Sequence, residues 1–301
     1  MKIEPGYQRL QQEGLLSLRA DRLFQSLADC QLCPHRCRVD RLKGERGYCQ
    51  TGKLARVASY APHYGEETPL VGSGGSGTIF FAHCNLQCVY CQNYDLSVEG
   101  RGREVEPGKL AGIMLSLQDR GCSNINFVTP SHVIPQILKA LELAAKEGLN
   151  LPLVYNSGGY DLAPVLQELE QVVDIYMPDI KYLDQERALR YSGIADYPQR
   201  VREALQTMHE QVGVLRLNDR GLARKGLMIR HLVLPGGLED TRRILEFIAG
   251  ELSPDTYLNL MDQYYPSHQA HQYQDLQSPL SRGEFRQAVR MAQGLGLNNL
   301  A

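Results

Sequence analysis

The sequence predicts an α/β protein: a partial (β/α)6 barrel of the TIM type, preceded by a small cysteine-rich segment. From residue 78 onward, short apolar runs alternate with amphipathic stretches of helical period. The apolar runs lack an alternation of polar and apolar residues, as expected for strands that are covered on both faces. Polar residues follow several of these runs, where the loops after the strands would begin. Eight strand–helix units would close such a barrel, so six leave it open.

Six strand–helix units account for most of the chain after residue 77. Right-handed connections make successive strands parallel, so the carboxyl ends of the strands share one rim. Pro107 suits a first helical turn, and Ser281 with Glu284 predicts a capping box. The predicted strands are 78–82, 125–129, 151–156, 172–177, 227–234 and 256–261, and the predicted helices are 107–121, 133–148, 161–171, 198–213, 239–252 and 281–294.

The length and charge of the chain limit its organisation and its partners. The 301 residues suit one large domain with a small appendage, and we divide them into a cysteine-rich segment, 1–65, and the barrel, 66–301. With 32 Lys and Arg against 34 Asp and Glu, no basic surplus supports a nucleic-acid partner. The first residues form no signal peptide, and no apolar run approaches the roughly 20 residues of a membrane span. We therefore expect a cytoplasmic protein with no membrane partner.

Residues 72–77, GSGGSG, are predicted to be a flexible linker before the first strand of the barrel. They lack the Gly-Lys-Ser/Thr ending of a phosphate-binding loop. They also precede a strand, whereas a phosphate-binding loop follows one. This segment therefore predicts no phosphate site.

Seven of the eight cysteines fall into two tight groups. In a reducing compartment such groups are metal ligands more often than disulfides. Cys84, Cys88 and Cys91 follow the first predicted strand with the spacing C-x3-C-x2-C. Structural zinc sites and simple electron-transfer clusters usually have four protein ligands. Three thiolates hold three irons of a [4Fe-4S] cluster, and the fourth iron is then open to another ligand.

The segment CNLQCVYC resembles the C-x3-C-x-aromatic-C signature of radical S-adenosylmethionine (SAM) enzymes. Together with GSGGSGTIFFAHCNLQCVYCQN, the segments DIYMPDIKY and RHLVLPG are similar to the activating enzymes of glycyl-radical enzymes, typified by pyruvate formate-lyase activating enzyme. This resemblance covers roughly residues 72–294 and implies the radical SAM fold. It implies reductive cleavage of S-adenosyl-L-methionine at the cluster to a 5'-deoxyadenosyl radical, which takes hydrogen from a protein or peptide. It also implies an electron donor such as flavodoxin or ferredoxin.

The resemblance assigns roles to individual residues. Cys84, Cys88 and Cys91 would bind the cluster, and Tyr90, in the aromatic position, would lie near the adenine. The other cofactor-binding positions that it implies lie on the predicted rim and are Asn156, Ser157, Asp179, Lys181, Arg230 and Gln263.

Plainer explanations exist for the same rim residues. Asp179 and Lys181 could form a surface ion pair, and Arg230 could be an ion-pair partner at the edge of the core. Asn156 and Ser157 could simply form a turn. The chain also departs from the family, because Thr129-Pro130-Ser131 stands where a Gly-Gly-Glu motif usually follows the second strand.

The first cysteine group has the spacing C-x2-C-x3-C-x11-C and consists of Cys30, Cys33, Cys37 and Cys49. Four thiols could bind zinc or a second [4Fe-4S] cluster. A zinc ribbon normally pairs two C-x2-C knuckles, and only one is present, so the spacing favours a cluster over zinc. The isolated Cys122 is expected to be a small buried apolar residue.

Two alternatives to the predicted enzyme remain. A non-catalytic iron–sulfur electron carrier or redox sensor would also gather cysteines, but it would not need the polar rim residues. A radical SAM enzyme that acts on a small molecule would share the whole barrel. An electron carrier would not cleave SAM, so a cleavage assay distinguishes it from the predicted enzyme. The identity of the substrate distinguishes the second alternative.

Overall fold

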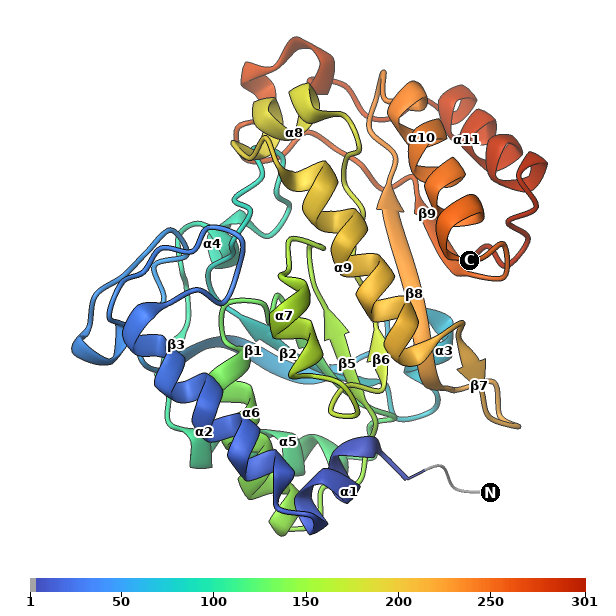
Figure 1. Cartoon of the computed structure of the whole chain (residues 1–301). Helices are drawn as coiled ribbons and strands as arrows, with labels where there is room; N and C mark the ends of the chain where they lie inside the picture. Colours follow the sequence, from blue (N-terminus) through green and yellow to red (C-terminus); the bar gives the residue numbers. More distant parts are fainter. Residues whose placement is uncertain (1–3) are drawn as a thin grey trace.

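Six parallel strands form the centre of one nine-stranded sheet, in the same order as in the chain (Figure 1). The computed structural model describes residues 4–301. The parallel strands are β2 (Ser76–Phe81), β4 (Ile125–Val128), β5 (Leu153–Asn156), β6 (Ile175–Tyr176), β8 (Ala223–Leu232) and β9 (Tyr257–Met261). The prediction of an α/β fold with six parallel strands in an open barrel is confirmed.

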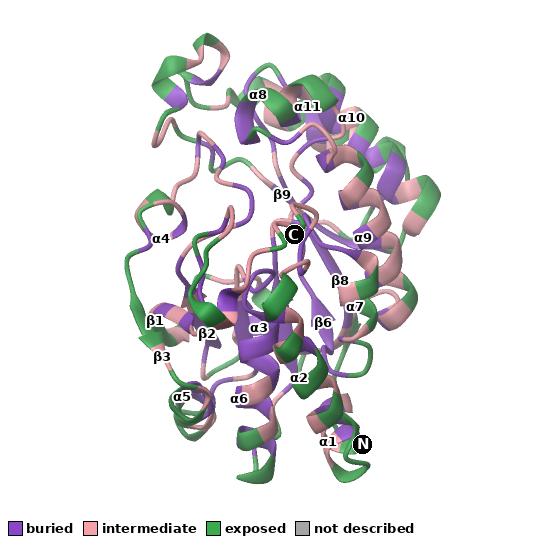
Figure 2. Cartoon of the chain, turned by 60° about the vertical axis from the view of Figure 1, so that its left-hand side comes forward, coloured by how far each residue is buried: buried purple, intermediate pink, exposed green. Residues whose placement is uncertain are grey.

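The predicted helices cover the outer face of this sheet, with their inner sides buried and their outer sides exposed (Figure 2). They are α5 (Pro107–Asp119), α6 (Ile134–Lys146), α7 (Ala163–Gln167), α9 (Tyr197–Val212), α10 (Leu238–Phe247) and α11 (Arg282–Gly294). Helix α7 is shorter than predicted, and a π-helical turn, η3 (Ile248–Leu252), replaces the predicted end of α10. The capping box of Ser281 and Glu284 is confirmed. No helix within residues 4–301 is long and apolar enough to span a membrane.

Several elements were not predicted from the sequence. Strand β1 (Ala55–His63) pairs antiparallel with β2, and β3 (Arg103–Val105) pairs with β1, so these two strands extend the sheet beyond the six parallel ones. Unpredicted elements after residue 65 include α3 (Thr68–Val71), α4 (Tyr94–Ser97), α8 (Gln185–Ser192) and β7 (Arg216–Leu217). Because β1 belongs to the central sheet, the first cysteine group reaches the barrel through a strand.

The amino-terminal part of the chain packs directly on the barrel. Helices α1 (Gly6–Gln12) and α2 (Leu15–Gln25) lie against α6, and Tyr7 and Leu16 are fully buried there (Figure 1). After these two helices come two short 3-10 turns, η1 (Ser26–Asp29) and η2 (Arg41–Lys43), which flank the first three cysteines of the quartet. Gln136 of α6 donates to the carbonyl of Lys53 at 2.8 Å. The division at residues 65 and 66 stays a prediction.

The interior of the barrel has an apolar layer and, nearer the carboxyl ends of the strands, a polar layer. The segment before β2 inserts Leu70 among inward-facing apolar side chains such as Val154, Ile175 and Met228. Closer to the rim, polar side chains from several strands point to the same interior; they are Asn126, Asn156, Arg230 and Asn259. The prediction that both faces of the strands are apolar is therefore wrong for this level. These polar groups are tolerated because each has a hydrogen-bond partner, which offsets the cost of burial: Arg230 bonds Asn156, and Asn126 and Asn259 bond glutamates that precede β2.

The glycine-rich segment 72–77 is not a flexible linker. Ser76 and Gly77 are the first residues of β2, and Gly77 is buried. A Cβ atom on Gly74 would lie 1.8 Å from the carbonyl oxygen of Gly121, so only glycine allows the two backbones to approach this closely. The prediction was wrong because the sequence gives no sign of this backbone contact, which joins positions far apart in the chain.

The substitution Gly74→Ala should therefore destabilise the fold, and Gly112→Ala should not. At Gly74 the backbone must shift to admit the methyl group, and overpacking of this kind costs about 1–3 kcal/mol. Gly112 lies exposed in α5 with open space around its Cα, so alanine there should stabilise the fold by about 0.5–1 kcal/mol. Urea unfolding of both variants measures the difference. Equal unfolding midpoints for wild type and Gly74→Ala would show that the segment is flexible after all.

Candidate active site

The three cysteines lie on the loop that joins β2 to α4, as predicted. His83 and Gln87 have positive φ angles, 70° and 54°, and these turns bend the backbone around the thiols. Every one of the three sulfurs has a polar partner. The backbone N–H of Leu86 donates to Cys84 Sγ at 3.4 Å, Ser192 Oγ lies 3.1 Å from Cys88 Sγ, and Ser97 Oγ lies 3.1 Å from Cys91 Sγ. Such donors stabilise negative charge on sulfur.

Burial controls the protonation of Cys84 and Cys88. It raises the pKa of Cys84 to about 12, with a further increase from the neighbouring Cys88. Burial also raises the pKa of Cys88, although the charge of Lys181 and the hydroxyl of Ser192 oppose it. The thiols of Cys84 and Cys88 are therefore protonated at neutral pH unless a metal replaces the proton, as it does in thiolate coordination.

The three thiols are compatible with a cluster in number and placement. Within residues 4–301, no group of three or more His, Cys, Asp or Glu side chains is arranged around one metal ion. The ligands of an iron–sulfur cube bind separate irons, so they need not converge on one point. Three thiols on a short, buried loop with N–H and O–H donors fit such a cube.

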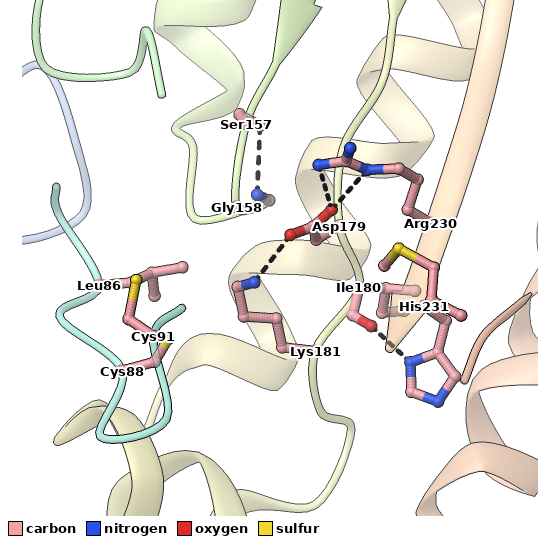
Figure 3. Close-up of polar contacts among 12 residues, drawn as sticks. Leu86, Cys88, Cys91, Ser157, Gly158, Asp179, Ile180, Lys181, Arg230 and His231 are labelled. Carbon is pink, nitrogen blue, oxygen red and sulfur yellow. Dashed lines mark hydrogen bonds and ion pairs between the residues drawn. The ribbon is translucent and has the colours of Figure 1, made fainter. Parts of the chain in front are cut away.

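A buried ion-pair network extends from the barrel interior to this loop (Figure 3). Arg230 donates from Nη2 to Asn156 Oδ1 at 2.9 Å and from Nε to Asp179 Oδ1 at 2.9 Å. Lys181 Nζ donates to Asp179 Oδ2 at 2.8 Å. Lys181 in turn lies close enough to Cys88 for each group to change the pKa of the other. The structure thus brings together four of the residues that the sequence singled out.

The Asp179–Lys181 pair is not a surface ion pair, because only about a fifth of each side chain is exposed. Burial alone would raise the pKa of Asp179, but the charges of Arg230 and Lys181 outweigh it and hold the pKa below its ordinary value. For Lys181, burial opposes ionisation, and the charge of Asp179 more than compensates, so its pKa is raised. All three groups therefore stay charged in the barrel interior.

Two glutamates that the sequence analysis missed complete the network. Glu66 accepts from Asn126 Nδ2 at 2.7 Å and lies 3.5 Å from Arg230 Nη1. Glu67 accepts from Asn259 Nδ2 at 2.8 Å, and burial raises the pKa of its carboxyl group. Both glutamates immediately precede α3 and lie outside every motif that the sequence analysis used. The available signal was the asparagine inside each of the apolar runs 125–129 and 256–261.

Ser157 is engaged in the loop that follows β5. Its hydroxyl donates to Asp161 Oδ2 at 2.7 Å and accepts from the backbone N–H of Gly159 at 3.2 Å. Tyr155 donates to the other carboxylate oxygen of Asp161 at 2.7 Å. These bonds give Ser157 a turn-forming role, and its contact with a cofactor stays a prediction.

Tyr90 and Gln263 lie apart from the ion-pair network. Tyr90 is 5% exposed, accepts a hydrogen bond from the Tyr182 hydroxyl at 2.7 Å, and packs edge-on against three tyrosine rings. Gln263 is exposed, and its backbone carbonyl accepts from Gln92 Nε2 at 3.0 Å. The predicted contacts of Tyr90 with adenine and of Gln263 with the cofactor stay predictions.

The replacement of the Gly-Gly-Glu motif leaves a strained residue on the rim. Thr129 has a φ angle of 60°, which a β-branched residue rarely adopts. Its backbone N–H donates to the carbonyl of Asn156 at 2.8 Å, and this bond holds the unusual turn in place. Strain of this kind is typical of binding sites.

The fold and the site define an open (β/α) barrel with a three-cysteine loop after its first parallel strand. Residues 78–248 match the family model of the Radical SAM superfamily, and the chain belongs to this superfamily. It is 31% identical over 295 residues to "Uncharacterized protein MJ0674" of Methanocaldococcus jannaschii. This match covers 95% of the chain and 80% of the relative. The superfamily comprises enzymes that use a [4Fe-4S] cluster and SAM, and the donor set at Cys84, Cys88 and Cys91 fits that cluster.

Two solved structures also resemble the chain. They are native anSMEcpe with bound AdoMet, at 12% identity and a TM-score of 0.48, and the same protein with AdoMet and the Kp18Cys peptide, at 11% identity and a TM-score of 0.48. The first match covers 71% of this chain and 57% of the other, and the second covers 70% and 56%. The chain therefore spans less than three fifths of those structures.

His231 has a structural role beside the network. Its Nδ1–H donates to the carbonyl of Ile180 at 2.7 Å, and its Nε2 accepts from Thr241 Oγ1 at 3.0 Å. Burial lowers the pKa of His231 to about 4, so the imidazole is neutral. Arg230 and His231 are consecutive on β8 and therefore point to opposite faces of the sheet (Figure 3).

His231 should make the fold sensitive to acid. Because its folded pKa is below the unfolded value of 6.5, its stabilising effect is complete above that pH and is lost as the pH falls toward about 4. The loss is on the order of 3 kcal/mol. His231→Asn keeps a donor for Ile180 without a titrating ring, so urea unfolding of the cluster-free variant should depend less on pH in this range. The exposed His271→Asn is the control, and an unchanged pH dependence in His231→Asn would contradict the assignment.

Proposed function

We propose that the chain binds a [4Fe-4S] cluster through Cys84, Cys88 and Cys91 and cleaves SAM reductively to take a hydrogen atom from a protein or peptide. The reduced cluster, recharged by the electron donor, would supply the one electron that divides SAM into methionine and a 5'-deoxyadenosyl radical; this radical would become 5'-deoxyadenosine on taking a hydrogen atom and would leave a radical on the substrate. The observation that carries this proposal is the buried network of Asn156, Arg230, Asp179 and Lys181, which ends beside Cys88. A plain electron carrier has no use for such a network.

The network offers groups of both signs to a zwitterionic ligand such as SAM. Lys181 and Arg230 suit the methionyl carboxylate, and Asp179 and Asn156 suit the amino group and the ribose hydroxyls. Each of these side chains already has a partner in the barrel, so binding exchanges partners and adds little new desolvation. The groups are also held in place before the ligand arrives, which favours a single binding geometry.

The open form of the barrel supports a polypeptide substrate. The six parallel strands do not close on themselves, so one side of the rim can admit an extended loop. An open cavity also adjoins the cysteine loop, since Ser192, which contacts Cys88 Sγ, lines it. Other residues that line this cavity are Tyr48, Gln87, Val89, Arg190, His268 and Tyr273. The resemblance to activating enzymes makes a glycine of a glycyl-radical enzyme the first candidate substrate, with flavodoxin or ferredoxin as the electron donor.

Anaerobically reconstituted protein with SAM and dithionite should form 5'-deoxyadenosine and methionine. Cys88→Ser should abolish both products. Asp179→Asn should weaken SAM binding about ten- to a hundredfold, the effect of losing hydrogen bonds to a charged group. Cys122→Ser is the matched control, because this buried cysteine lies between α5 and β4 and has no role in the proposed site.

Two outcomes would contradict the proposal. Cluster-loaded protein that forms no 5'-deoxyadenosine would be an electron carrier. If product forms, the substrate class is tested with deuterium-labelled candidate glycyl-radical enzymes, where deuterium should pass into 5'-deoxyadenosine and a glycyl radical should appear by electron paramagnetic resonance. Transfer from small molecules alone would overturn the polypeptide substrate.

A further inference from the structure

We infer that Cys30, Cys33, Cys37 and Cys49 hold a second iron–sulfur cluster, closed by four thiolates, which braces the loop of the first cluster. All four cysteines line one small cavity, together with Arg41 and His132. Positive φ angles at Arg36 and Arg38 turn the backbone on either side of Cys37. This inference does not rest on the proposed SAM chemistry.

The spacing favours a cluster over a single zinc ion. Cys30, Cys33 and Cys37 occupy eight residues as C-x2-C-x3-C, which reverses the C-x3-C-x2-C spacing of the radical SAM loop. A loop of this length can supply three thiolates to one face of a cube. Cys49, which approaches from beyond η2, then supplies the fourth ligand, so no iron is left open.

A buried cation beside the thiols requires a negative group. Arg41 is 1% exposed. Within residues 4–301 its partners are the carbonyls of Gly52 and His132, at 2.9–3.0 Å, and Cys30 Sγ at 3.7 Å, with no carboxylate among them. A buried guanidinium without a counter-ion is costly. A cluster with four thiolate ligands is negatively charged and would be the counter-ion of Arg41.

The backbone is shaped to accommodate a sulfur ligand at Cys37. A Cβ atom on Gly47 would lie 2.6 Å from Cys37 Sγ, so the glycine makes room for the sulfur. The next residue, Tyr48, donates its backbone N–H to the same sulfur at 3.3 Å. An N–H directed at sulfur stabilises a thiolate and tunes a cluster.

His132 supplies a separate indication that the cavity has an occupant. Its Nε2 lies 2.9 Å from the carbonyl of Ala82, so that nitrogen carries the proton and Nδ1 has a free lone pair. The side chain is 1% exposed, and Nδ1 has no partner within residues 4–301. Unpartnered buried nitrogen atoms are rare in folded proteins. A hydrogen-bond donor in the cavity that His132 lines with the four cysteines, such as an ordered water beside the cluster, would satisfy this one.

The two cysteine loops are joined by direct contacts. His35 donates from Nε2 to the carbonyl of Asn85 at 2.8 Å, and its ring stacks on Tyr48 with centroids 3.8 Å apart. Gln87 Nε2 donates to the carbonyl of Tyr48 at 3.2 Å. A centre that fixes residues 33–49 therefore also fixes the backbone between Cys84 and Cys88.

Metal analysis of the reconstituted wild-type protein tests the inference directly. We expect about eight irons and eight sulfides per chain, because each cube holds four of each. The double variant Cys33→Ser, Cys49→Ser should retain about four irons. After reduction, its electron paramagnetic resonance signal should change when SAM is added. Cys84→Ser combined with Cys88→Ser should retain about four irons with a signal that SAM leaves unchanged. Cys122→Ser should keep all the iron.

The wild-type count is decisive even if a cysteine variant fails to fold. About four irons with one zinc would overturn the cluster in favour of zinc, and about four irons without zinc would overturn the site. Loss of SAM cleavage with about eight irons retained would contradict only the proposed function.

The role of Arg41 and the bracing of the loop have their own readouts. Arg41→Met should lose the iron of the quartet, and Arg41→Lys, which keeps the charge, should retain it. Hydrogen exchange at the amides of residues 85–88 should be at least about tenfold faster in the Cys33/Cys49 variant, while α9 is unchanged. Iron retention in Arg41→Met would overturn the counter-ion role, and unchanged exchange would overturn the bracing.

Discussion

The pairing of Arg230 with Asp179 is the interaction on which the rim of this barrel depends. It operates through the backbone as well as the side chains: Ile180 N–H donates to the Arg230 carbonyl at 2.9 Å, and Arg230 N–H donates to the Pro178 carbonyl at 3.0 Å. Strand β6 itself has only two residues, so these bonds continue it past Pro178. The same pairing directs Lys181 toward the cysteine loop. It also presents the Ile180 carbonyl to His231 on the other face.

Charge balance explains why this interior can exist at all. Asp179, Glu66 and Glu67 face two cations, Arg230 and Lys181, so carboxyl groups are in excess. Burial relieves part of the excess by raising the pKa of Glu67. A ligand with a positive sulfonium, such as the SAM that the superfamily uses, matches the remaining negative charge. The apolar residues around Leu70 close the opposite end of the interior to water, which strengthens every charge interaction above them.

The sequence predicts the features that depend on local pattern. Helical period, the apolar runs and the cysteine spacing locate the six units and the loop at Cys84, because each of these signals lies within a few residues. The sequence does not reveal a residue's role when its contact partner lies far away in the chain. Asn126 bonds Glu66 sixty positions away, and Asn259 bonds Glu67 across 192 positions, so neither glutamate carries a mark of its role. Gly74 was misread for the same reason, since its neighbour Gly121 lies on another segment.

The amino-terminal cysteine segment contacts the barrel directly through hydrogen bonds. Arg41 bonds the carbonyl of His132, and His132 bonds the carbonyl of Ala82, so one chain of contacts runs from the quartet through the loop after β4 to the end of β2. A second chain runs from His35 to Asn85. The cysteine motif at 84–91 thus has support from two sides, and its geometry is determined by residues that the motif does not contain. Metal binding at the quartet would stabilise both sets of contacts. These contacts join the quartet to the loop of Cys84, Cys88 and Cys91, so fixing the first segment also fixes the second.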